Sequence, residues 1–167
     1  MLAEAVTAVA LSLSTGGGAA APIQVELPNQ GYKIGYLTIP KLGLKSWPIR
    51  QGTRSSELDR GIGHLRSTFL PGMRGTIGFF GHRVTHVLSL QHGPFRYINR
   101  LKLGNRIIVV MPYGRYVYRV RRKFIVTSKS WNTFRPQTES EKLLLAACHK
   151  PGSAQFRLVV EAIREEA

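Results

Sequence analysis

Short stretches in which apolar residues alternate with polar ones, or run together, follow one another through most of the chain. Stretches of roughly four to eight such residues, rich in β-branched and aromatic side chains and bounded by Gly or Pro, are typical of β-strands. This pattern predicts strands over residues 34–39, 76–80, 106–111, 116–120 with a continuation to 126, 143–147 and 156–160. A hairpin turn at Pro112-Tyr113-Gly114 joins two of them. Many short strands with turns between them predict an all-β fold, a closed or nearly closed barrel.

Three other segments carry different signals. Trp47-Pro48-Ile49 reads as a short edge strand, because Pro has no N–H to give to a central ladder. Ser55–Leu58, with Ser before Glu and Leu, is predicted to begin a helical turn. Helical periodicity is present at Pro94–Leu101, where Phe95, Ile98 and Leu101 recur at every third position.

The first 30 residues differ from the rest of the chain. Residues 5–25 carry no charge, but Ala, Thr, Ser and Gly dominate over Leu, Ile and Phe, and no Lys or Arg precedes them. The stretch has the length of a bilayer span, about 20 residues, without the hydrophobicity. We expect residues 1–30 to be a flexible leader or the remnant of a membrane anchor. Residues 31–167 are then one domain, at roughly 100–200 residues per domain.

The charge of the chain is strongly unbalanced. Its 167 residues include 24 Lys and Arg against 9 Asp and Glu, a net charge of +15. Residues 60–138 contain no acidic residue and 15 of the basic ones, so this stretch holds the whole excess. Such a field attracts nucleic acid, anionic lipid or cell-wall polymers, or simply keeps a basic face solvated. The single aspartate, Asp59, leaves few carboxylate pairs for glycosidase chemistry or for Mg²⁺ and Ca²⁺ sites.

Cys148 is the chain's one cysteine, which excludes an internal disulfide framework and a multi-Cys zinc site. It stands where the apolar strand 143–147 stops, a position that favours a working thiol over a core residue. Arg157 follows nine residues later on the next strand, and His82 also stands at a strand end. We therefore expect Cys148, His82 and Arg157 to meet at one rim.

Those three groups together are suited to acyl transfer. A free thiol is mostly protonated at neutral pH, and nearby cations favour the thiolate that attacks. The histidine can then protonate a leaving amine, and the arginine can hydrogen-bond the substrate carbonyl oxygen or its oxyanion. This chemistry proceeds through a thioester and needs neither metal nor organic cofactor.

Six segments follow one another in order between about Gly35 and Ile163: Leu37–Leu42, Asp59–His64, Leu70–Gly72, Gly78–Arg83, Leu145–His149 and Arg157–Val160. Together they resemble the sortases, cysteine transpeptidases of Gram-positive cell surfaces. In that family the last three segments carry the catalytic histidine, cysteine and arginine. Gly-His-Arg together with Cys-His most resembles the class E group of actinobacteria.

The resemblance implies a closed barrel of about eight strands with one or two short helices. It implies Cys148 as nucleophile, His82 as general acid and Arg157 as the substrate-positioning and oxyanion group. The expected substrate is a sorting-signal peptide such as Leu-Pro-x-Thr-Gly or Leu-Ala-x-Thr-Gly, cleaved between Thr and Gly. The expected acceptor is an amine of a peptidoglycan precursor or pilin. The site of action would be the anionic envelope surface, outside the cytoplasm, with a membrane tether.

The chain also departs from the family pattern. Ala147 and Leu144 stand where members commonly have Thr, so Ala147 is a candidate substrate contact that lacks the usual hydroxyl. Because residues 83–93 contain no acid, the calcium site of some sortases is not expected. His86, just after His82, is a candidate for the substrate groove. His64 and His92 are predicted to be surface or loop-packing residues, and His149 should point away from Cys148.

Two other functions compete with this one. The first is a basic β-barrel module that binds nucleic acid, suggested by the charge and by Tyr113, Tyr116 and Tyr118 interleaved with arginines. It does not account for the placement of Cys148, His82 and Arg157, so no nucleic-acid partner is expected. The second is an L,D-transpeptidase, whose Ser-His-Gly-Cys-x-Arg pattern is missing from this chain.

Overall fold

A computed structural model of the chain describes residues 28–84, 93–151 and 153–165. Its strands are β1 Lys33–Ile39, β2 Leu44–Gln51, β3 Ile62–His64, β4 Thr76–Phe80, β5 Arg106–Met111, β6 Gly114–Thr127, β7 Lys142–Cys148 and β8 Phe156–Arg164. Its helical segments are α1 Ser55–Leu58 and the 3-10 turns η1 Pro40–Leu42, η2 Ile98–Arg100 and η3 Trp131–Phe134. The predicted strands and the helical turn at Ser55–Leu58 are confirmed. Apart from its last three residues, the predicted leader lies outside the described residues.

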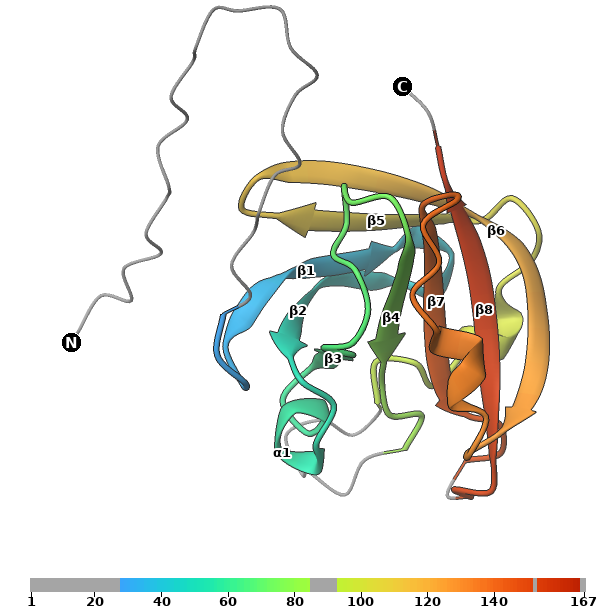
Figure 1. Cartoon of the computed structure of the whole chain (residues 1–167). Helices are drawn as coiled ribbons and strands as arrows, with labels where there is room; N and C mark the ends of the chain where they lie inside the picture. Colours follow the sequence, from blue (N-terminus) through green and yellow to red (C-terminus); the bar gives the residue numbers. More distant parts are fainter. Residues whose placement is uncertain (1–27, 85–92, 152, 166–167) are drawn as a thin grey trace, which may run out of the picture.

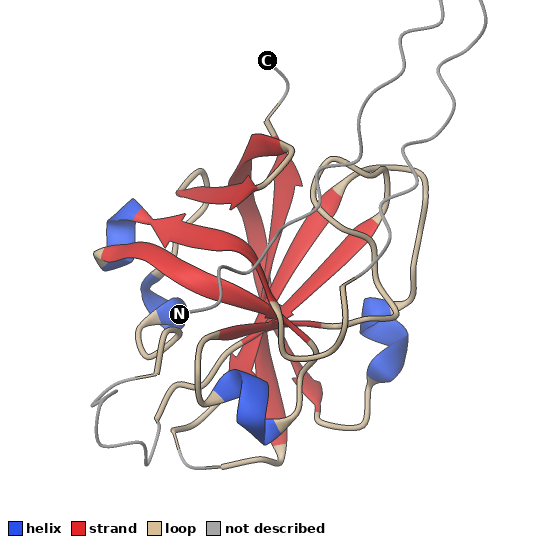
Figure 2. Ribbon diagram, turned by 90° about the vertical axis from the view of Figure 1, so that its left-hand side faces the viewer, coloured by secondary structure: helices blue, strands red, loops and turns tan. Residues whose placement is uncertain are grey.

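The eight strands close into a barrel in the order β1-β2-β3-β4-β7-β8-β6-β5, and β5 pairs back with β1. Two neighbouring pairs, β2 with β3 and β4 with β7, are parallel, and the others are antiparallel. Figure 1 shows β7 and β8 side by side, with the long β6 curving along the other edge of β8. Figure 2 shows the helices in the connections around the strands. The predicted closed all-β barrel with short helices is confirmed.

The core fills the barrel because successive side chains of a strand point to opposite faces. Alternate residues of β7 and β8 belong to this interior cluster: Leu143, Leu145, Ala147, Leu158, Val160 and Ala162. Large side chains from other strands complete it, among them Phe79 and Tyr118, both fully buried.

The intervening residues form a second apolar cluster on the outer face of the same strands. We call it the outer cluster: Phe134, Leu144, Ala146 and Val159, with Leu65, Phe80, Phe124 and Val126 packed against them. The 3-10 turn η3 covers part of it, since the Phe80 and Phe134 ring centroids are 4.8 Å apart. The wall that leads to the end of β7 is therefore apolar on both faces.

The prediction that Trp47-Pro48-Ile49 is an edge strand is wrong. These residues lie within β2, which pairs with β1 on one side and β3 on the other. The ladder with β3 begins only at Ile49, so no residue of β3 needs an N–H from Pro48. A short parallel ladder thus admits a proline that a longer one would reject.

The predicted helix at Pro94–Leu101 is replaced by tight turns that include η2. Its hydrogen bonds join residues three apart, such as Ile98 N–H to Phe95 O at 3.1 Å. The spacing of Phe95, Ile98 and Leu101 nevertheless predicts their burial correctly, because all three are inaccessible to solvent. A period of three fits a 3-10 turn as well as one face of a helix.

Candidate active site

Three adjacent strands, β4, β7 and β8, bring the predicted residues to one end of the barrel. Phe80 of β4 pairs with Ala146 of the parallel β7, and Gly81 N–H continues that ladder by donating to Ala146 O at 3.1 Å. His82 therefore leaves β4 at the level where β7 ends at Cys148. Cys148 pairs across the antiparallel ladder with Arg157 of β8.

Cys148 is half-buried and is the last residue of its strand. By alternation it shares the outer face with Ala146, and directly paired residues have side chains on the same face, so Arg157 does too. The outer cluster lies beside them on this face. The thiol is thus presented at the end of an apolar surface, accessible rather than enclosed in the core.

His82 is held by groups from two sides. Its Nε2 lies 3.1 Å from Asp59 Oδ1, and both side chains are partly exposed. Its carbonyl accepts the Phe95 N–H at 3.0 Å. Residue 93 must be glycine, because a Cβ there would sit 2.1 Å from the His82 carbonyl oxygen.

Asp59 reaches the histidine because α1 ends directly before it. The helix lies in the crossover between the parallel strands β2 and β3, and Asp59 is its C-cap. The Glu57 carboxylate fixes the helix start by accepting the Arg54 N–H at 2.8 Å, and hydrogen bonds from Ser56, Gln30 and this N–H help to lower the pKa of Glu57 against the effect of its burial.

The Arg157 guanidinium folds back onto its own turn. Its Nη1 donates to Ala154 O at 2.7 Å and more weakly to Phe156 O at 3.4 Å. Neither bond uses a carboxylate, so the five N–H donors of the guanidinium are not committed to a charged partner within the described residues. An arginine held in this way can turn toward a carbonyl oxygen near Cys148.

A second arginine, Arg83, also lies against the nucleophile's strand. It is 9% exposed, and its Nη1 donates to the backbone oxygens of Cys148, at 3.5 Å, and His149. Burial is the largest cause that lowers the pKa of Arg83, and the charge of Cys148 acts in the opposite direction.

Sequence reasoning missed both Asp59 and Arg83 as parts of this site. Arg83 follows His82 directly, but it is not on the strand after Cys148, where the sequence predicts the catalytic arginine. Asp59 belongs to a segment that resembles the family and is the only aspartate in the chain. Being the only aspartate in the chain is the one feature of the sequence that points to Asp59.

Two candidate substrate contacts are not placed at the site. Ala147 is 2% exposed in the barrel interior, on the face opposite Cys148, so it offers no surface there to a substrate. His86 lies outside the described residues, as do His92 and most of the segment in which no calcium site was expected. Elsewhere in the described ranges, no three His, Cys, Asp or Glu side chains gather as a metal site would need.

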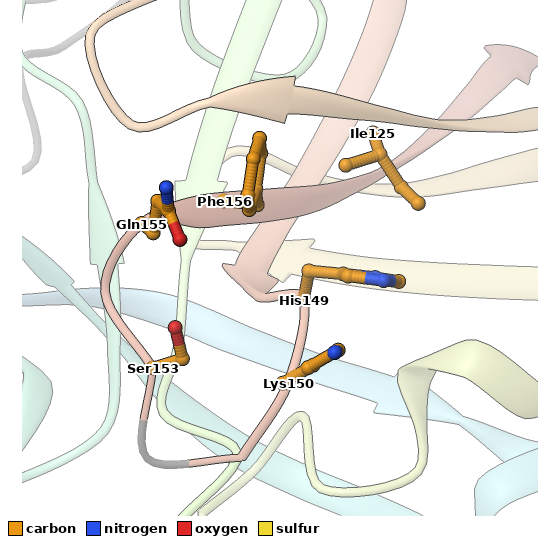
Figure 3. A pocket seen from close by; sticks show the side chains of 6 residues that line it. All are labelled: Ile125, His149, Lys150, Ser153, Gln155 and Phe156. Carbon is orange, nitrogen blue, oxygen red and sulfur yellow. The ribbon is translucent and has the colours of Figure 1, made fainter.

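His149 points away from Cys148, as expected from alternation. Its side chain lines a hollow of about 410 Å³ together with residues of β6, of the β7–β8 turn and of the start of β8 (Figure 3): Ile125, Lys150, Ser153, Gln155 and Phe156. This hollow contains none of the three predicted catalytic side chains. It lies beside the candidate site but on the other face of the sheet.

His64 is not a surface residue but lies fully buried in β3. Its Nδ1 is 2.7 Å from the Gln51 side chain, and its Nε2 is 3.0 Å from Phe69 O and 3.2 Å from Thr68 Oγ1. Burial lowers the pKa of His64 to about 4. It is therefore a neutral structural residue that packs the loop after β3, and the loop-packing part of the expectation holds.

Comparison with known proteins assigns this chain to a family. The family model for the sortase domain matches residues 37–165. Sortase D of Bacillus subtilis (strain 168) is 30% identical over 136 residues, 80% of this chain and 64% of that protein. Sortase SrtE1 of Streptomyces coelicolor is 38% identical over 110 residues, 62% of this chain and 29% of that protein. The chain thus spans less than two thirds of the length of either relative.

Solved structures agree with this assignment. The SrtA sortase from Actinomyces oris superposes with a TM-score of 0.75 at 28% identity and covers 87% of each chain. A Clostridium perfringens Sortase D5 transpeptidase gives a TM-score of 0.72 at 22% identity, over 83% of this chain and 82% of that one. At that identity the second likeness shows the fold alone.

Proposed function

This chain belongs to the sortase family, and from that premise we propose that it is a cysteine transpeptidase with Cys148 as nucleophile, His82 as proton donor and Arg157 as oxyanion donor. The observation that carries the proposal is the cross-strand pair of Cys148 and Arg157 beside the end of β4, where His82 follows. Sortases act at the cell surface of Gram-positive bacteria, and the proposal extends that setting to this chain.

The reaction proceeds in two halves. The Cys148 thiolate attacks the carbonyl carbon of the Thr–Gly bond, the C–N bond breaks, and His82 gives a proton to the leaving Gly amine. Arg157 donates hydrogen bonds to the oxyanion. An acceptor amine then attacks the thioester carbon, His82 takes a proton from it, and the C–S bond breaks to restore Cys148.

The outer cluster supports an apolar donor peptide. Phe80, Phe124 and Val126 are partly exposed members of the outer cluster, on the face that ends at Cys148. A sorting signal of the type Leu-Pro-x-Thr-Gly or Leu-Ala-x-Thr-Gly can bury its leucine on such a surface, at about 25 cal/mol per Å² removed from water. The acceptor is an amine of a peptidoglycan precursor or a pilin. Curated relatives of both D and E type match this chain, and the class E resemblance remains a prediction.

The location proposed is the outer surface of the cell envelope, with residues 1–30 as a linker from a membrane tether. No helix among the described residues is both long and apolar enough to span a bilayer. The positive net charge supports contact with anionic envelope polymers.

The nucleic-acid alternative finds no support. Its tyrosines do not form an exposed stacking platform, because Tyr118 is fully buried and donates a hydrogen bond to Glu141 Oε1 at 2.5 Å. Arg164 covers the ring of Tyr116 at 4.4 Å. Bases therefore have no row of free aromatic faces on this strand.

The proposal is tested by incubating the protein with peptides of both sorting-signal types and measuring cleavage and the mass of Cys148. We expect a thioester on Cys148 and cleavage between Thr and Gly. Cys148→Ala should reduce cleavage to background while thermal unfolding stays unchanged, because only the attacking atom is lost. His149→Gln is the matched control, since this neighbour faces the other side of the sheet, and it should cleave normally. Undiminished cleavage by Cys148→Ala would end the assignment.

A further inference from the structure

Arg83 makes more polar contacts around the site than any of the three predicted catalytic residues. Its Nε donates to Arg96 O at 3.2 Å, and its Nη2 donates to Asn99 Oδ1 at 2.9 Å. Its Nη1 donates to the backbone oxygens of Cys148 and His149. One side chain thus joins the end of β4, the turns around η2 and the end of β7.

The partners of Arg83 are all neutral oxygens: three backbone carbonyls and one side-chain amide. No carboxylate among the described residues forms an ion pair with it. A guanidinium remains charged, and burying it beside carbonyls alone is unfavourable unless the geometry of the fork is needed. Simple ion pairing therefore does not account for an arginine at this position.

The position of Arg83 in the chain relates its hydrogen bonds to the predicted catalytic residues. Its backbone follows His82 directly, while its guanidinium donates to the carbonyl of His149 and, at the longer distance of 3.5 Å, to that of Cys148. A single residue, Arg83, therefore connects the backbone of the proton donor His82 to the end of the strand that carries the nucleophile Cys148. His82 is held on its other side by the Phe95 N–H, from the same turns that anchor Nε and Nη2 of Arg83.

From these contacts we infer that Arg83 is a positioning residue that sets the separation of His82 and Cys148 by clamping the end of β7 to the turns around η2. This inference rests on the proposed function. A planar fork with donors in three directions can hold these strands, whereas the single ammonium of lysine cannot reach all four acceptors. Arg83 contributes to the site through the geometry of its hydrogen bonds rather than through its positive charge.

The test compares Arg83→Lys and Arg83→Gln with Arg96→Gln as the matched control. The Arg96 guanidinium lies over the Tyr97 ring at 5.6 Å, and only its backbone oxygen contacts Arg83. Arg96→Gln therefore removes a neighbouring positive charge and leaves the clamp intact. Asn99→Ala keeps Arg83 but removes one of its hydrogen-bond acceptors, so it is a milder perturbation of the same contacts.

Three measurements separate positioning from a purely structural role. The first is kcat and KM for thioester formation with a sorting-signal peptide. The second is the rate at which iodoacetamide alkylates Cys148, which needs the thiol but not its alignment with His82. The third is hydrogen exchange at the amides of residues 143–151, with thermal unfolding as the check on folding.

Both Arg83 variants should lose on the order of 100-fold in kcat, the cost of misplacing reacting groups by about 1 Å. KM should change by less than about threefold, because ground-state binding on the outer cluster is untouched. Alkylation of Arg83→Lys, which keeps a positive charge near the thiol, should also change by less than about threefold, while exchange at the end of β7 accelerates in both variants. Asn99→Ala should lose roughly tenfold in kcat, and Arg96→Gln should match the parent.

The inference is overturned if Arg83→Lys restores the parent kcat, since charge alone would then suffice. It is equally overturned if kcat and alkylation fall by the same factor in Arg83→Lys, which keeps the charge, because that result indicates general loss of structure. Should both Arg83 variants fail to fold, Asn99→Ala decides by the same criteria. A parent protein that forms no thioester refutes the proposed function, while hydrogen exchange at β7 still tests the clamp by itself.

Discussion

Asp59 and His82 show how a carboxylate from outside the apolar surface can orient a proton donor. The carboxylate reaches Nε2 at 3.1 Å from the C-cap of α1, in the connection between β2 and β3, whereas His82 follows β4. Both side chains are partly exposed, so water and salt screen their attraction. The pair therefore orients the imidazole more than it stabilises the fold.

At this scale we expect Asp59→Asn to lower kcat by at most about fivefold at low salt, because exposed ion pairs contribute no more than about 1 kcal/mol. Asparagine still accepts a hydrogen bond from the ring, so only the charge attraction is lost. Steady-state cleavage at low and high NaCl measures this, and the gap from the parent should close at high salt. A loss comparable with that of His82→Ala at every salt concentration would contradict a merely orienting role.

Strand β3 is a short element whose stability depends on one buried histidine. His64 connects it to β2 through Gln51 and to the following loop through Thr68 and Phe69. Since burial lowers its pKa to about 4, against an ordinary value near 6.5, the unfolded chain binds a proton that the folded one rejects in this range. Stability conferred by the neutral ring is present above about pH 6.5 and is lost as the pH falls toward 4.

Urea unfolding should show this loss as about 2 kcal/mol between pH 7 and pH 5. The His64→Gln variant lacks the titrating ring. Its free energy of unfolding should therefore change less between pH 7 and pH 5, even if the variant is less stable than the parent at pH 7. The comparison cancels the contributions of carboxylates, which are common to both proteins. Equal pH slopes for the parent and the variant would show that His64 is not the group responsible.

Elements with a strong local pattern were predictable, and those fixed by distant partners were not. Strand β7 is an apolar run that ends at Cys148, and the sequence alone shows both features. The pairing of β2 on both sides depends on how late its ladder with β3 begins. The turns around η2 carry the period of a helix, but their close contact with His82 and Arg83 exists only in the folded chain.

The same division applies to the candidate site. Cys148, His82 and Arg157 could be named because each stands at or next to a strand end beside a recognisable motif. Asp59 and Arg83 could not, because their contacts depend on the crossover that holds α1 and on turns near residues 96–99. Side chains that support a site from outside its strands leave little trace in local sequence.

The whole molecule carries its positive excess unevenly. Glutamates within β8, directly after β8 and directly before β7 pair with arginines of β5, β6 and β8, among them Glu161 with Arg122 at 2.7 Å and Glu165 with Arg119 at 2.9 Å. Residues 60–138 have no acid of their own, so such pairs reach only a few of the basic side chains, and the chain keeps a net charge of +15. The molecule as a whole should therefore approach anionic surfaces.

We expect the protein to bind vesicles that contain phosphatidylglycerol and not vesicles of phosphatidylcholine alone. Raising the salt from about 0.1 M to about 1 M shortens the screening length from about 10 Å to about 3 Å, so binding should weaken at least about tenfold. Co-sedimentation over a salt series measures this. Equal binding to both lipids, or no response to salt, would argue against an electrostatic attraction.

Closure of the barrel has a consequence for how any peptide is recognised here. At the end of the barrel that carries the candidate site, β4, β7 and β8 each have hydrogen-bonded neighbours on both sides, so a guest chain finds no free edge among these three strands to extend. Its main chain is not expected to be recognised there by β-augmentation. Discrimination between donors must come from how their side chains fit the outward-facing residues of β4, β7 and β8 and the connecting loops, which makes loop sequence the natural place for relatives of this protein to diverge in what they accept.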